Sequence, residues 1–84
     1  MFNLFINNYN ISFNEIFEIR EIKTGRKIGK YYFIQDNEDV FKLYKCREYS
    51  KKDRHLLVSS SMTGDILTGL MKNKITIIKI NEFV

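Results

Sequence analysis

Apolar and polar side chains alternate in short stretches along the chain, and turn-forming residues separate one stretch from the next. A period of two residues predicts β-strands with one buried face. The strongest signal is the run Tyr31, Tyr32, Phe33 and Ile34, within a predicted strand over 27–35. Further strands are expected over 2–6, 40–49, 55–61 and 74–80, with polar turns over 35–39 and 50–54.

The segment 12–23 fits two patterns. Ser12 and Glu15 have the spacing of a helix capping box, and the apolar residues that follow would share one helical face. Over 17–20, however, apolar and charged residues alternate at strand period, and the turn at Gly25 would then join two strands of a hairpin. Because Ile and Phe fill the segment and both prefer strands, the hairpin is favoured. Gly25 would serve equally as a helix C-cap, so the helix stays open.

Apolar residues after position 64 recur at helical spacing and predict one short helix from Gly64 to Lys72. The fold class that follows is mostly β: a small antiparallel meander or partly closed barrel with one short helix. The alternative is an α+β fold, with a helix packed on an antiparallel sheet, if the segment 12–23 is helical.

Composition narrows the class of protein further. The 84 residues form a single small domain, 1–84, with one cysteine, Cys46, which excludes an intramolecular disulfide and suits a reducing compartment. No run of 18 apolar residues predicts a membrane span, so a cytoplasmic location is expected, in a cell or an infected host. The chain contains neither a Cys/His cluster for a metal nor a glycine-rich phosphate loop, and no cofactor is expected. Its net charge of +4 excludes an acidic mimic of nucleic acid.

The single histidine is the obvious catalytic candidate. His55 lies two residues from Asp53, so in a strand the carboxylate could orient the imidazole. Sequence places no Ser or Cys beside them as a nucleophile, and a surface histidine in a charged turn is the simpler interpretation. A metal-independent ribonuclease needs no such nucleophile, because RNA supplies its own 2′-OH; Tyr49, Arg54 and His55 have suitable side chains. This toxin-like enzyme is the third hypothesis.

Cations and tyrosines concentrate in the same two stretches, 23–32 and 42–54. If the strands in these stretches pair, their basic and aromatic side chains would share a sheet surface, as in proteins that bind single-stranded nucleic acid. A one-residue error in strand phase would send each of these side chains to the other face. Single-stranded nucleic-acid binding is therefore the second hypothesis.

A non-catalytic protein-binding module is the favoured function. A short chain with no catalytic set, rich in Asn, Ile and Lys and lacking Pro and Trp, resembles in composition the small accessory proteins of phages and mobile elements. Many of these inhibit a larger host machine, in the anti-CRISPR or another anti-defence manner. Exposed strand edges would add to the sheet of a larger partner, such as a nucleic-acid-handling complex, or pair with themselves in a homodimer. The predicted binding residues are aromatic or cationic: Tyr32, Tyr44, Lys45, Arg47, Tyr49 and Arg54.

Overall fold

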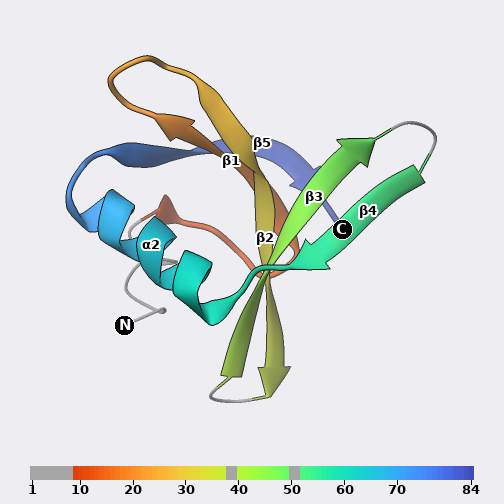
Figure 1. Ribbon diagram of the computed structural model, residues 1–84. Helices are drawn as coiled ribbons and strands as arrows, with labels where there is room; N and C mark the ends of the chain where they lie inside the picture. Colours follow the sequence, from red (N-terminus) through yellow and green to blue (C-terminus); the bar gives the residue numbers. More distant parts are fainter. Residues whose placement is uncertain (1–8, 38–39, 50–51) are drawn as a thin grey trace.

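The computed structural model describes residues 9–37, 40–49 and 52–84 and contains one antiparallel sheet and one short helix (Figure 1). The elements in chain order are β1 (Glu15–Glu21), β2 (Lys27–Asn37), β3 (Val40–Tyr49), β4 (Lys52–Leu57), α2 (Ser60–Met71) and β5 (Ile75–Phe83). The five strands lie in the order β4-β3-β2-β1-β5. The prediction of a mostly β fold with one short helix is confirmed, and the sheet is not closed into a barrel.

The segment that fitted two patterns is a strand. Glu15, Phe17 and Ile19 are buried and the residues between them are partly exposed, so burial follows the period of a strand. The Ser12–Glu15 spacing does produce a contact, because the Ser12 N–H donates to Glu15 Oε1 at 3.1 Å, but a turn and not a helix follows. Gly25 has φ of +73°, which the hairpin turn between β1 and β2 requires.

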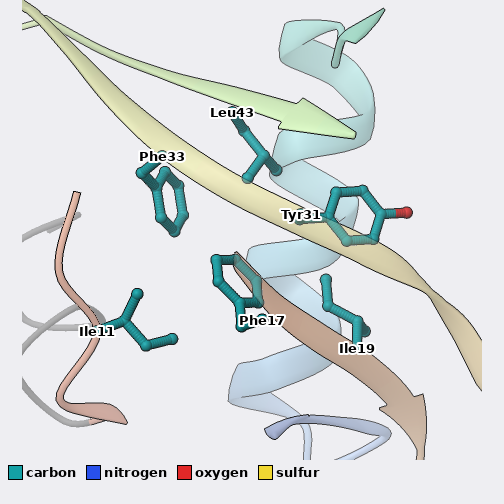
Figure 2. Packing of buried hydrophobic residues seen from close by; sticks show 6 residues of the cluster. All are labelled: Ile11, Phe17, Ile19, Tyr31, Phe33 and Leu43. Carbon is teal, nitrogen blue, oxygen red and sulfur yellow. The ribbon is translucent and has the colours of Figure 1, made fainter. Parts of the chain in front are cut away.

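The core lies between one face of the sheet and α2. Phe17 stacks on Phe33 with ring centroids 5.7 Å apart, and Leu43 of β3 completes the buried set from three adjacent strands (Figure 2). Ile66 of α2 and Ile77 of β5 pack against the same cluster. A single layer of aromatic and branched side chains therefore fills the space under the helix, while no helix of the described residues covers the opposite face of the sheet (Figure 1).

The helix begins four residues earlier than the apolar spacing predicts. Ser59 is its N-cap, with its hydroxyl accepting from the Met62 N–H at 3.2 Å. A serine run was expected to end a strand over 55–61, and this part of the prediction is wrong: β4 stops at Leu57. Serine side chains compete for backbone N–H groups and so favour a cap over a strand end.

Three other boundaries differ from the sequence prediction. β2 continues to Asn37, so the polar turn expected over 35–39 is shorter, and β4 already begins at Lys52 within the turn expected over 50–54. β5 extends to Phe83, past Asn81, whose φ of 57° accompanies a shift in the β1–β5 register. A prediction from the apolar period misses these strand ends because their residues are mostly polar or charged. The first predicted strand, 2–6, lies outside the described residues.

Candidate functional site

The sheet divides the predicted binding residues between its two faces. Tyr32 lies directly opposite Tyr44, and Tyr31 lies directly opposite Lys45. Successive residues of a strand point to opposite faces, so the two tyrosines of the first pair occupy one face and Lys45 the other. The expected surface that carries all these rings and cations together does not form.

On the face of the sheet opposite α2, Tyr32 and Tyr44 form a compact stack. The rings of Tyr32 and Tyr44 are 5.5 Å apart and nearly parallel, and the Tyr32 side chain is almost completely buried. The Tyr32 hydroxyl lies 2.8 Å from His55 Nδ1, and the imidazole meets the Tyr32 ring edge-on. Burial raises the pKa of Tyr32, and the neighbouring Cys46 and Tyr44 raise it further. These rings are thus engaged with one another and not presented to a planar ligand.

On the other face, cations follow the β3–β4 hairpin. Lys45 Nζ lies 5.5 Å from the centroid of the Tyr31 ring, a cation–π contact, and Arg47 is exposed. Gly29 leaves room for this lysine, because a Cβ there would approach Lys45 Cε to 3.0 Å. The hydroxyl of Tyr31 points away from the core cluster (Figure 2).

The backbone register extends this basic face toward the hairpin turn. Arg47 is the cross-strand neighbour of Arg54, and Tyr49 is the neighbour of Lys52. Directly opposed residues share a face, so four of the six predicted residues, Lys45, Arg47, Tyr49 and Arg54, occupy positions on one side of the hairpin. Only the backbone positions of Tyr49 and Arg54 are described. The register thus brings these four residues together and places Tyr32 and Tyr44 on the opposite face.

His55, the catalytic candidate considered from the sequence, has a described side-chain contact on β2. Its Nδ1 is already hydrogen-bonded to Tyr32, and Asp53 is described only by its backbone. Among the described residues, no three His, Cys, Asp or Glu side chains lie close enough together to hold a metal ion. Within the same residues, no helix has the length and apolar character needed to cross a bilayer.

The charge of the chain is unevenly distributed, a feature that sequence reasoning missed. The segment from Val40 to Leu57 contains six cations and two carboxylates, and the remaining residues contain eight of each. The whole net charge of +4 therefore belongs to the β3–β4 hairpin. Figure 1 shows this hairpin directed away from α2, and β4 is an edge of the sheet. Counting acidic as well as basic residues in each stretch of the sequence reveals the asymmetry.

A groove lies next to the end of this edge strand, between β3 and the first turns of α2. Its volume is about 440 Å³. Its lining includes the apolar side chains of Phe41, Leu43, Leu57, Val58 and Leu67, with Lys42 beside them. Leu57 is 58% exposed, so an apolar side chain from another molecule could cover it.

Comparison of the chain with protein-family models, with curated proteins and with solved structures gives no significant match.

Proposed function

We propose that the protein is a non-catalytic binding module whose β3–β4 hairpin docks an extended, acidic segment of a partner protein along the outer edge of β4. The observation that carries this proposal is the coincidence of the entire net positive charge with an edge strand of the sheet. An inhibitor that acts by contact with a larger protein, the function favoured by the sequence, would use this edge.

Like charges placed opposite each other favour an anionic partner. Arg47 and Arg54 are cross-strand neighbours in β3 and β4, an arrangement that destabilises a hairpin when no anion is present. A carboxylate from the partner would relieve this repulsion and would form charge-assisted hydrogen bonds with the exposed Arg47 guanidinium.

The edge also offers contacts that are specific to a polypeptide. Edge strands present backbone N–H and C=O groups to which an extended segment adds by main-chain hydrogen bonds. The last two residues of β4, Leu56 and Leu57, are 43% and 58% exposed and lie on opposite faces of the strand. Apolar side chains of the added segment would cover them, which gives selectivity for alternating residues.

Nucleic acid fits the site less well. Base stacking needs exposed aromatic faces, but Tyr32 is buried and stacked on Tyr44, and Tyr31 lies under the Lys45 ammonium. Phosphate contacts alone would give binding without the rings, and such binding falls steeply with salt.

The test compares a labelled peptide of alternating Val and Glu with labelled oligothymidine by fluorescence anisotropy, for the natural chain, Arg47→Glu and Lys23→Glu. Both variants reverse one exposed cation, so both have the same net charge, but only Arg47 lies on the hairpin. We expect micromolar binding of the peptide, a loss of at least tenfold in Arg47→Glu and little change in Lys23→Glu. Tighter binding of oligothymidine, or equal effects of the two variants, would refute the proposal.

A further inference from the structure

The edge of the sheet formed by β5 differs in charge and in apolar content from the basic edge formed by β4. β5 ends the strand order opposite to β4, and no described strand pairs with its outer side. Four of its nine residues are isoleucine, and Ile78 is 38% exposed on the face without the helix. A long, apolar strand whose outer side has no partner among the described strands is a template for another strand.

Charged side chains commonly protect such an edge, but both charges of β5 are engaged within the chain. Lys79 Nζ lies 2.8 Å from the Asn10 carbonyl oxygen and 3.5 Å from the buried Glu15 carboxylate. Glu82 lies 3.5 Å from Lys30 Nζ. The two charges also cancel each other, so β5 offers no electrostatic complement to a charged partner.

We infer that β5 pairs with β5 of a second copy of this chain, antiparallel and across a twofold axis centred on Ile78. Residues opposed in an antiparallel pair share a face, so a symmetric pairing must be centred on one residue. Centring on Ile78 opposes Ile78 to itself and Thr76 to Ile80, and it places Lys79 opposite Ile77. No like charges then face each other, in contrast to a pairing centred on Lys79.

The distribution of charge selects a second copy as the occupant of this edge. Each copy carries its +4 on the β3–β4 hairpin, at the far edge of the sheet from β5. Pairing through β5 keeps the two basic hairpins at opposite ends of a continuous ten-stranded sheet, whereas pairing through β4 would bring them together. The dimer would present two basic edges, but its formation does not depend on what those edges bind.

Sedimentation equilibrium from 1 to 500 μM protein, in 0.15 M salt, tests this inference on the natural chain and two variants. Ile78→Arg opposes two guanidinium groups at the twofold axis, and Leu57→Arg makes the same change on the exposed part of β4. We expect a monomer–dimer equilibrium with a dissociation constant on the order of micromolar, typical of a small interface. Ile78→Arg should raise this constant at least tenfold, and Leu57→Arg should leave it within twofold.

A further variant distinguishes a weaker dimer interface from a defect in folding. Ile78→Thr keeps a β-branched side chain suited to a strand and removes only apolar surface. It should weaken the dimer several-fold while circular dichroism shows an unchanged fold. A natural chain that stays monomeric at 500 μM would overturn the inference, as would a dimer that is disrupted by Leu57→Arg and not by the Ile78 variants.

Discussion

The hydroxyl of Tyr32 lies 2.8 Å from Nδ1 of His55 and links two strands that are not neighbours in the sheet. Tyr32 belongs to β2 and His55 to β4, with β3 between them. The bond therefore spans β3, and the ring of Tyr44 in β3 stacks on that of Tyr32. A side chain from the sheet centre thereby holds the edge strand that we propose as the docking edge.

Tyr32→Phe should lower the free energy of unfolding by about 0.5–1.5 kcal/mol, because the ring stack remains but the hydrogen bond to His55 is lost. Urea unfolding at pH 7 measures the change. Tyr31→Phe is the matched control: it removes the same atom from a tyrosine whose hydroxyl makes no hydrogen bond in the described part of the chain. An equal loss in both variants would show that the Tyr32–His55 bond contributes nothing.

The raised pKa of Tyr32 predicts a loss of stability in alkali. The unfolded chain releases this proton near the ordinary pKa of 10.0, while the folded chain retains it to higher pH. Above pH 10 the unfolded state therefore binds fewer protons, and the free energy of unfolding falls as pH rises. Tyr32→Phe lacks this proton, so its difference from the natural chain should shrink between pH 9 and 11. A constant difference over that range would contradict the pKa shift.

Two glycines of α2 should respond with opposite sign to the same substitution. A Cβ at Gly64 would meet nothing within 4 Å, so Gly64→Ala should stabilise the protein by about 0.5–1 kcal/mol through helix propensity. A Cβ at Gly69 would lie 3.0 Å from Ile75 Cγ1, where the helix packs against β5. Gly69→Ala should therefore destabilise by about 1 kcal/mol despite the same gain in propensity. Thermal unfolding that shifts equally in both variants would exclude this close packing.

Lys79 should contribute more to the free energy of unfolding than other surface lysines do. Glu15 is 3% exposed. Its carboxylate accepts a hydrogen bond from the Ser12 N–H and forms an ion pair with the Lys79 ammonium. Lys79→Met leaves this carboxylate with reduced compensation and should lower the free energy of unfolding by about 1–3 kcal/mol. Lys74→Met, at an exposed position before β5, should change it by less than about 0.5 kcal/mol. If the two variants lose equally little, the Glu15–Lys79 pair is not a stabilising contact.

The period of the apolar residues predicts most of this fold. It locates β3 with its correct bounds and favours the hairpin of β1 and β2, because strands with one buried face alternate apolar and polar residues. The start of α2 is missed, since Ser59 acts through a hydroxyl cap and not through an apolar pattern. The same holds for the start of β4 at Lys52, where an edge strand of charged residues shows no alternation.

Predicting the candidate site required strand phase as well as residue type. Tyr32 and Lys45 fall on opposite faces because Tyr44, and not Lys45, is the cross-strand neighbour of Tyr32. That register depends on the bulge near Gln35 and Asn37, which local composition does not specify. The Tyr32–His55 bond depends on three strands and so lies beyond any local pattern.

Amide hydrogen exchange, measured by NMR with and without the Val–Glu peptide, tests whether the outer edge of β4 binds an acidic polypeptide strand, as we propose. We expect the peptide to increase the protection of amides in β4 and to leave those of β5 unchanged. Protection that appears elsewhere, or no change in β4 while the peptide is bound, would contradict it.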